Sequence, residues 1–350
     1  MINSKYAVAI VGFGGMGNWH RELLGEFDRL ACIGTYDIDP ARQAAAAVYG
    51  LHPYNSLEEL LDDERVDIVL IATPNDVHKE IAIKAMQSGK TVVSEKPVTM
   101  SSNDLQKMID CATVNKVLFT VHQNRRWDED YLIMKKIYEE NLLGEIFNVE
   151  SRILGSRGIP GDWRAQKEHG GGMVLDWGVH ILDQILQMFP EKVSSVFAKL
   201  DHVTSKEVDD GFKIFPTFES GKTALLEVGT SNFINLPRWY MQGINGTAVI
   251  DDFSARGRIV RIQNWDKYEV IPVKTAAGLT KTMAPRIDDT IVECPLPFVK
   301  SDIHDFYNNV ADVIEGKAPP FIKHYELMRC MKLMETVFKA DRLNKVLDFE

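Results

Sequence analysis

A glycine-rich turn directly after a short apolar run is the feature that most constrains how this 350-residue chain can fold. The run covers Tyr6–Val11, and its length and unbroken apolar character are typical of a strand buried on both faces of a parallel sheet. A helical stretch begins at about residue 16, so the sequence predicts a strand, a tight turn and a helix in succession. The turn has the pattern G-x-G-x-x-G and consists of Gly12, Phe13, Gly14, Gly15, Met16 and Gly17.

Strand and helix patterns alternate through the first third of the chain. The capping-box pattern of Ser56 and Glu59 and the proline at position 40 indicate helix starts between the strands. This alternation predicts an α/β domain with a doubly wound parallel sheet, the Rossmann architecture, which we assign to residues 1–122. The other predicted strands are residues 30–36, 66–72, 91–94 and 117–121, and the predicted helices are residues 16–27, 40–49, 75–88 and 102–115.

The pattern changes after residue 123. Turn signals such as Asn245-Gly246 separate several short strands between residues 193 and 273, as in an antiparallel sheet. We therefore assign residues 123–350 to a second, α+β domain with a large, mostly antiparallel open sheet. Helices are predicted at residues 128–141, 170–188, 301–315 and 325–344, with a strand at residues 146–153.

Composition restricts the remaining function classes. The chain has 40 lysines and arginines and 50 aspartates and glutamates, so its net charge is −10. This balance disfavours nucleic acid and anionic membranes as partners, because both require a basic face. No apolar run reaches the ~18–20 residues of a membrane-spanning helix. The four cysteines are far apart, so we expect free thiols and a cytoplasmic setting.

The glycine loop predicts a dinucleotide site. Its glycines allow a tight turn and a close approach of the backbone to a pyrophosphate, which the N–H groups at the helix start can bind. Asp37 lies 20 residues after Gly17, at the end of the second strand, where a carboxylate accepts hydrogen bonds from the adenosine ribose. This carboxylate favours NAD, while the nearby Arg42 leaves NADP open. The alternative is a glycine turn with a solvated aspartate.

Lys96 lies in the tetrapeptide Ser94-Glu95-Lys96-Pro97, which ends another predicted strand of the same sheet. Ligands of open α/β sheets bind outside the carboxyl ends of the strands, so Lys96 is predicted to face the cofactor crevice. A surface lysine paired with Glu95 explains the tetrapeptide equally simply. The tetrapeptide alone favours this simpler explanation.

A second candidate group lies on the predicted helix that Gly170-Gly171-Gly172 opens. Asp176, His180 and Asp183 follow one another at i, i+4 and i+7 and so share one helix face. Two flanking carboxylates would raise the basicity of the histidine, which suits a general base. A hydrogen-bonded core histidine is the alternative, and spacing does not separate the two. We predict no metal, because no H-x-x-x-H or C-x-x-C pattern adds ligands.

Taken together, these motifs resemble the glucose–fructose oxidoreductase / inositol dehydrogenase / rhizopine-catabolism (Gfo/Idh/MocA) family over essentially the whole chain. Five short segments in the same order carry the resemblance. They are residues 12–17, Ala72-Thr73-Pro74-Asn75 with His78, Glu95-Lys96-Pro97, Asn124-Arg125-Arg126, and the stretch from Gly171 to His180.

The resemblance implies roles for individual residues. Lys96, Asp176 and His180 would meet at the nicotinamide as the catalytic group, and Glu95 would lie near the nicotinamide ribose. Arg126 and Asp183 are substrate-side candidates together with the catalytic three, although each could equally form a structural ion pair. The other residues implied along the cofactor are Thr73, Pro74, Asn75, His78 and Asn124, with Trp163 and Arg164 of the Asp162-Trp163-Arg164 loop.

The resemblance also implies an activity: an NAD(P)-dependent oxidoreductase acting on a ring alcohol of a sugar, glycoside or cyclitol, with oxidation at position 3 of a glycoside as one case. His180 would take the hydroxyl proton, Asp176 would orient the imidazole, and Lys96 would hydrogen-bond the reacting oxygen. An NAD-dependent glycoside hydrolase and a non-catalytic dinucleotide sensor are the alternatives. Relatives commonly associate through the exposed sheet face of the second domain, so a homodimer or homotetramer is expected.

Overall fold

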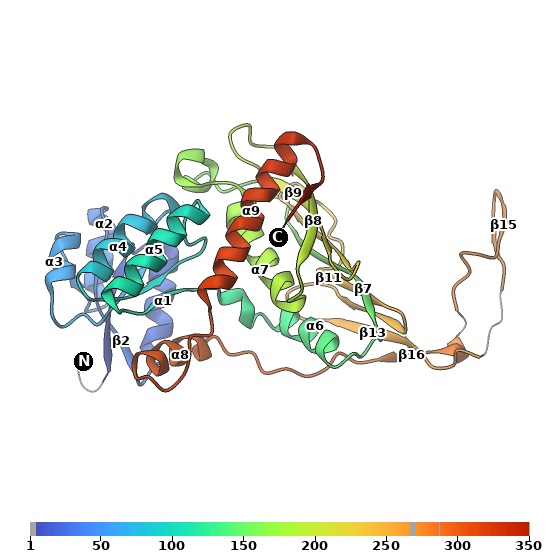
Figure 1. Cartoon of the computed structure of the whole chain (residues 1–350), viewed down its shortest axis with the longest axis horizontal. Helices are drawn as coiled ribbons and strands as arrows, with labels where there is room; N and C mark the ends of the chain where they lie inside the picture. Colours follow the sequence, from blue (N-terminus) through green and yellow to red (C-terminus); the bar gives the residue numbers. More distant parts are fainter. Residues whose placement is uncertain (1–4, 267–270, 287, 350) are drawn as a thin grey trace.

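The computed structural model describes residues 5–266, 271–286 and 288–349. Its N-terminal part is built on a six-stranded sheet with the order β3-β2-β1-β4-β5-β6, in which every pairing is parallel (Figure 1). The reversal of strand order at β1 confirms the predicted doubly wound architecture. The strands are β1 (Tyr6–Val11), β2 (Leu30–Tyr36), β3 (His52–Pro53), β4 (Ile68–Ile71), β5 (Thr91–Ser94) and β6 (Phe119–Val121).

Helices connect these strands close to where the sequence predicts them. Buried residues throughout β1 and β4 show that helices cover both faces of the sheet, which explains the unbroken apolar runs. Asp39 and Ser56 accept hydrogen bonds at the starts of two helices, and Ser56 does so from the Glu59 N–H as in the predicted capping box. The helices are α1 (Gly15–Gly25), α2 (Pro40–Val48), α3 (Leu57–Asp62), α4 (His78–Gln87) and α5 (Ser102–Asn115).

The second part of the chain forms the predicted large sheet. Its nine strands have the order β16-β13-β12-β11-β7-β10-β9-β8-β17, and all pairings are antiparallel except that of β7 with β10. The strands are β7 (Ile146–Leu154), β8 (Val193–Asp201), β9 (Gly211–Phe218), β10 (Thr223–Gly229), β11 (Trp239–Gly243), β12 (Gly246–Ile250), β13 (Gly257–Ile262), β16 (Ile291–Cys294) and β17 (Leu347–Asp348). A small separate hairpin consists of β14 (Val273–Thr275) and β15 (Gly278–Thr280).

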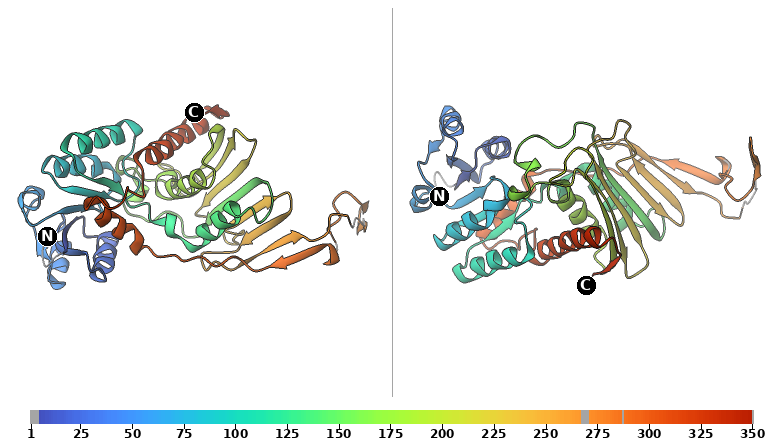
Figure 2. Two further views of the ribbon diagram at one scale, coloured as in Figure 1. Left: turned by 60° about the horizontal axis from the view of Figure 1, so that its bottom comes forward. Right: turned by 90° about the horizontal axis from the view of Figure 1, so that it is seen from above.

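Three helices lie on one face of the nine-stranded sheet, as Figure 2 shows: α6 (Glu129–Glu139), α7 (Val179–Met188) and α9 (His324–Leu343). Residues of β7, β8 and β10 alternate between buried and half-exposed, because only this face is covered. The predicted helix of residues 170–188 is not one α-helix. It begins with a π-helical turn, η5 (Val174–Gly178), and continues as α7.

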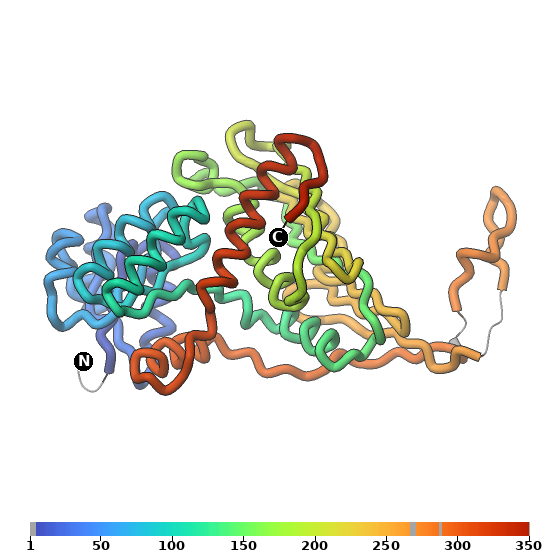
Figure 3. Tube along the Cα trace, viewed as in Figure 1, coloured from blue at the N-terminus to red at the C-terminus, as the bar shows by residue number. Residues whose placement is uncertain are grey.

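The chain returns to the N-terminal sheet after β16. Figure 3 shows the trace running back along the molecule to α8 (His304–Ile314), which lies near α1 and β2. There Arg29 forms ion pairs with Asp312 and Glu315, at 2.8 and 3.0 Å. We therefore propose that α8 belongs to the N-terminal unit, although the sequence division places it in the second domain. Helix α9 then contacts both α5 and β8. Among the described helices none has both the length and the apolar character that a membrane crossing requires.

Candidate active site

The glycine loop has the geometry that a dinucleotide site requires. Gly12 has a φ of +91°, and a Cβ at this position would lie 2.6 Å from the carbonyl oxygen of Ala72. A Cβ at Gly17 would overlap the carbonyl oxygen of Gly12. Gly15 is the first residue of α1, and a Cβ added there would have no neighbouring atom within 4 Å. Because the first N–H groups of a helix have no intrahelical acceptor, this end of α1 can bind a phosphate.

We expect Gly17→Ala to weaken cofactor binding by about 10- to 100-fold. The added methyl group would push α1 away from the turn at Gly12, and overpacking of this kind typically costs about 1–3 kcal/mol. Fluorescence titration with NADH measures the dissociation constant. Gly25→Ala on the same helix is the control, because no atom lies within 4 Å of its added Cβ. Equal affinities of the two variants would contradict the packing argument.

Asp37 already has partners in the chain. Its carboxylate accepts hydrogen bonds from the Phe13 N–H at 2.7 Å and from the Asp39 N–H at 2.8 Å, and so joins the glycine loop to the end of β2. The guanidinium group of Arg42 lies 3.5 Å from the same carboxylate. The predicted ribose site therefore contains one acid and one base side by side, the combination that leaves both NAD and NADP open.

The residues after β4 lie at the same edge of the sheet. The Asn75 amide donates to the carbonyl oxygen of Gly170 at 2.9 Å and so joins the two domains. Both ring nitrogens of the buried His78 contact backbone carbonyl oxygens, those of Pro97 (3.0 Å) and Thr73 (2.9 Å). His78 thus holds the Thr73-Pro74 turn against the Lys96-Pro97 turn. Its predicted contact with the cofactor remains a prediction, as does that of Pro74.

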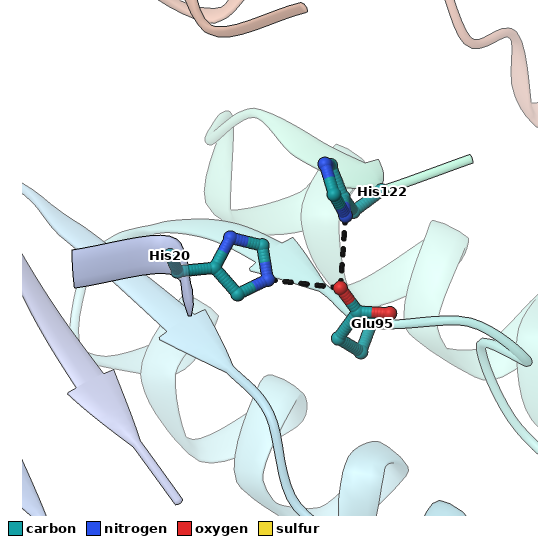
Figure 4. A group of neighbouring side chains, drawn as sticks. All are labelled: His20, Glu95 and His122. Carbon is teal, nitrogen blue, oxygen red and sulfur yellow. Dashed lines mark hydrogen bonds and ion pairs between the residues drawn. The ribbon is translucent and has the colours of Figure 1, made fainter. Parts of the chain in front are cut away.

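Glu95 is buried in a hydrogen-bonded cluster that the sequence did not predict (Figure 4). Its Oε1 atom accepts from His20 Nε2 and from His122 Nδ1, both at 2.8 Å, and its Oε2 atom accepts from the Lys96 N–H at 3.1 Å. Burial by itself raises the pKa of Glu95, but attraction to His122 and hydrogen bonds from both histidines outweigh it, so that the pKa lies well below its usual value. Glu95 is therefore ionised.

The same cluster connects α1, β6 and α8. A carboxylate can only accept, so His20 donates through Nε2, and its Nδ1 accepts from the hydroxyl of Tyr307 on α8. Burial lowers the pKa of His20, which is consistent with a neutral ring. The ligand atoms of His20, Glu95 and His122 lie within 4.8 Å of one another, a spacing that could also hold a metal ion. The two histidine–carboxylate hydrogen bonds explain the same spacing, so the prediction of no metal stays a prediction.

Lys96 and Asp176 meet across the two domains. The Lys96 ammonium group donates to the Asp176 carboxylate at 2.9 Å and to the Asp176 carbonyl oxygen at 3.0 Å. Arg164 approaches the other carboxylate oxygen at 3.6 Å. Burial raises the pKa of Asp176, but the charges of Lys96 and Arg164 outweigh it and hold the pKa below its usual value. The surface pairing of Lys96 with Glu95 that the tetrapeptide suggested is replaced by this contact.

His180 lies at the start of α7, one helical turn beyond Asp176. It is buried, and its Nδ1 atom has no hydrogen-bond partner among the described residues. Burial lowers the pKa of His180 well below its ordinary value, and the charges of Lys96 and Arg125 lower it further. The ring is therefore neutral at pH 7 and can accept a proton. Trp177 packs edge-on against it, with ring centroids 5.7 Å apart.

The carboxylates expected on either side of His180 are engaged elsewhere. Asp176 pairs with Lys96, and Asp183 forms a bidentate ion pair with Arg126 at 2.6 and 2.7 Å. The cations Lys96 and Arg126 therefore determine where these two carboxylates point. Asp176 is hydrogen-bonded to Lys96, while His180 Nδ1 has no partner among the described residues, so the orientation of the His180 ring by Asp176 stays a prediction.

Arg126 and Asp183 form part of a buried ionic group. The third partner is Glu326 of α9, whose carboxylate accepts from Arg126 at 2.7 Å. Burial lowers the pKa of Arg126, but the two carboxylates outweigh it and raise the pKa overall. All three guanidinium nitrogens are engaged. This geometry matches the structural ion pair that the sequence left open, and a substrate contact of Arg126 or Asp183 stays a prediction.

Arg126→Met is expected to lower the free energy of unfolding by about 3–5 kcal/mol, because removing one partner leaves the buried carboxylates uncompensated. Chemical denaturation followed by circular dichroism measures the loss. The exposed pair Arg256–Asp252 supplies the control, since Arg256→Met should change stability little. A raised KM with unchanged stability would instead assign Arg126 to the substrate.

The Asp162-Trp163-Arg164 loop lies beside the catalytic group. Arg164 lies over the ring of Trp163, with 4.5 Å between the guanidinium carbon and the ring centroid. The backbone carbonyl oxygen of Arg164 accepts a hydrogen bond from the Gly172 N–H at 3.0 Å. Arg164 also approaches Asp176, while the implied contact of Trp163 and Arg164 with the nicotinamide stays a prediction. A cavity of about 860 Å³ adjoins the loop at Ala165 and is formed by residues 156–159, 203–207, 231 and 233. The three catalytic candidates do not line that cavity.

Buried polar atoms near the sheet edge fit a bound cofactor. The side-chain oxygens of Thr73 and Asn124 are buried and have no hydrogen-bond partner among the described residues. Thr73 follows β4 and Asn124 follows β6, so both lie beyond the carboxyl ends of strands, where nucleotides bind in this architecture. With the open helix end at Gly15, these atoms offer the hydrogen-bonding groups that a dinucleotide needs.

Comparisons with known proteins identify the family of the chain. A family model described as "Oxidoreductase family, NAD-binding Rossmann fold" matches residues 6–123, and the "GFO/IDH/MocA C-terminal domain" matches residues 131–249. The fold and the matches define an NAD(P)-binding oxidoreductase. The chain belongs to the Gfo/Idh/MocA family.

The named relatives differ in activity. The crystal structure of an NAD-binding protein from Listeria innocua is 48% identical, covers 99% of this chain and 100% of its own, and superimposes with a TM-score of 0.94. The scyllo-inositol 2-dehydrogenase (NADP(+)) of Bacillus subtilis is 28% identical over 98% of this chain and 96% of its own. The glucose-6-phosphate 3-dehydrogenase of the same organism is 27% identical over 59% of this chain and 63% of its own.

Proposed function

We propose that this protein is an NAD(P)-dependent dehydrogenase that interconverts a ring secondary alcohol and the corresponding ketone of a sugar, glycoside or cyclitol. The observation that carries the proposal is the contact of Lys96, from the cofactor domain, with Asp176, one helical turn before a buried neutral histidine of the second domain. The activities of the scyllo-inositol 2-dehydrogenase and the glucose-6-phosphate 3-dehydrogenase among the relatives support the substrate class.

Each catalytic residue then has one task. The nicotinamide supplies the hydride acceptor or donor. His180 accepts the hydroxyl proton during oxidation, because its ring is neutral and buried. Two of the three Lys96 N–H groups are directed at Asp176, and the third can donate to the reacting oxygen and stabilise developing alkoxide charge. Asp176 holds the lysine in place, and Arg164 approaches the other oxygen of the same carboxylate.

We propose NAD as the cofactor, with NADP as the alternative. Asp37 supports NAD because its carboxylate would repel a 2′-phosphate, while Arg42, which lies 3.5 Å away, would attract one. Dissociation constants for NADH and NADPH, measured side by side on the purified protein, decide between them. A tighter complex with NADPH would overturn the proposed preference.

The activity is tested with a panel of cyclitols, hexoses and glycosides, each assayed for the absorbance of the reduced cofactor. Turnover of at least one ring alcohol is expected. Release of free sugar from a glycoside without accumulation of reduced cofactor would instead indicate a hydrolase of the same family. Cofactor binding without any turnover would indicate a sensor.

We further propose that copies of the chain associate as a homodimer or homotetramer through the uncovered face of the nine-stranded sheet. Phe197 of β8 and Phe215 of β9 lie on adjacent strands with their rings 6.2 Å apart, and both are partly exposed. Light scattering during gel filtration measures the molar mass, and a mass of 39.6 kDa would contradict the proposal.

A further inference from the structure

Asp209 is a buried carboxylate that no step of the proposed mechanism uses. It lies two residues before β9, in the segment that follows β8, and is 4% exposed. Its Oδ2 atom accepts a hydrogen bond from the Val174 N–H at 2.7 Å, and its backbone oxygen accepts from the Met173 N–H at 2.9 Å. Two contacts from one residue therefore fix the point where the π-turn begins.

The absence of a side chain at Gly172 leaves room for the Asp209 carboxylate. Gly172 has a φ of +104°, and a Cβ there would overlap Asp209 Oδ1. The N–H groups at the start of a helical segment have no intrahelical acceptor, and a negative charge at this end is favourable. Asp209 thus supplies from a distant loop the acceptor that a capping side chain supplies in other helices.

The π-turn carries the catalytic carboxylate. Val174, which Asp209 holds, is the first residue of η5, and Asp176 follows two positions later and receives Lys96. Building on the proposed function, we propose that Asp209 is a positioning residue whose ionised carboxylate holds the start of the π-turn and thereby fixes Asp176 against Lys96.

The surroundings of Asp209 make its charge sensitive to pH. Burial raises the pKa of Asp209 to about 7, while the backbone N–H of Val174 and the side chain of His202, in the same loop, act in the opposite direction. His202 itself hydrogen-bonds the carbonyl oxygen of Val208 at 3.0 Å. As the pH falls through about 7, Asp209 takes up a proton, and its hydrogen bond to Val174 loses the contribution of the charge.

Hydrogen exchange tests the contact without reference to activity. In Asp209→Ala at pH 8, mass spectrometry should show at least about 10-fold faster exchange in peptides that span residues 172–180, since one hydrogen bond to a charged acceptor is typically worth about 1.5–3 kcal/mol. Asp210→Asn is the matched control: this neighbouring carboxylate accepts from Val203, Thr204 and Ser205 and does not contact the π-turn. The control should exchange like the wild type over residues 172–180.

Kinetics test the positioning role. Asp209→Ala should lower kcat by about 10-fold or more while the dissociation constant of the cofactor changes less than about 2-fold. In Asp209→Asn the amide oxygen can still accept from Val174 but cannot titrate. We therefore expect this variant to keep, at every pH, the reduced kcat expected of the wild type below pH 7, and to show no fall in kcat near pH 7.

The outcomes separate the two proposals. Unchanged exchange over residues 172–180 in both Asp209 variants overturns the positioning role, whether or not the enzyme turns over a sugar. Faster exchange in the absence of any turnover leaves the contact established and counts against the dehydrogenase. If Asp209→Ala does not fold by circular dichroism, Asp209→Asn decides on its own, because retention of the wild-type pH profile also overturns the proposal.

Discussion

Lys96→Ala is expected to lower kcat by about 10²- to 10³-fold, the effect typical of removing one hydrogen-bond donor from an oxyanion-type site. The ammonium group contacts Asp176 through two hydrogen bonds and is the cation placed to stabilise a developing alkoxide. The variant also leaves the Asp176 carboxylate with Arg164, 3.6 Å away, as its remaining cation partner. Absorbance of the reduced cofactor at saturating substrate measures the loss.

Cofactor binding should survive the same substitution. The Lys96 side chain hydrogen-bonds Asp176, whereas Asp37 hydrogen-bonds the glycine loop, which we assign to the dinucleotide, so the dissociation constant of NADH should change less than about 3-fold. Lys107→Ala is the matched control, because Lys107 forms a lysine–aspartate pair of similar length, 2.8 Å, on the surface of α5. Parallel loss of affinity and turnover in Lys96→Ala would show that the lysine shapes the fold rather than the reaction.

The parts of the site that the sequence predicts are those whose geometry is local. A strand, a glycine turn and a helix within residues 6–25 predict a tight turn in which the helix starts close to the end of the strand. The structure has this turn, with Gly12 at positive φ and Gly17 in contact with Gly12. Asp37 and Lys96 follow because the carboxyl ends of parallel strands must meet at one edge. These inferences need only the order of the elements.

Contacts between distant segments were beyond such reasoning. Glu326 joins Arg126 from 200 positions away, and Tyr307 reaches His20 across 287 positions. Periodicity describes one element at a time, so it could not show that α8 returns to the first domain. His20 and His122 do have a weak local signal, since one lies three residues after the glycine loop and the other directly follows β6.

The π-turn is the clearest failure of the helical pattern. Spacing at i, i+4 and i+7 predicted one α-helix with Asp176 and Asp183 beside His180, but the segment begins as a π-turn, Asp176 pairs with Lys96 and Asp183 pairs with Arg126. Asp209 and the positive φ of Gly172 hold that turn in place. The apolar residues of this stretch fit an α-helical pattern. The sequence therefore did not indicate the π-turn or the partners of the polar residues.

His180→Gln should lower kcat by about 10²- to 10⁴-fold, the range for loss of a general base, because glutamine keeps the polarity of the site but accepts no proton. The pKa of His180 in the unmodified enzyme gives a sharper test. Burial first, and then the charges of Lys96 and Arg125, hold the pKa of His180 well below its ordinary value, so the neutral base persists as the pH falls and activity is lost only in more acidic solution.

Removing one of those charges should move this loss of activity in a known direction. Arg125 lies over Trp177, 4.1 Å from the ring centroid, and pairs with Asp128 at 2.9 Å. In Arg125→Gln the pKa of His180 should rise, so that kcat begins to fall at a higher pH than before. The comparison is made in the Asp209→Asn background, where the titration near pH 7 is absent and the histidine is observed alone. A pH profile unmoved by Arg125→Gln would mean that a group other than His180 accepts the proton.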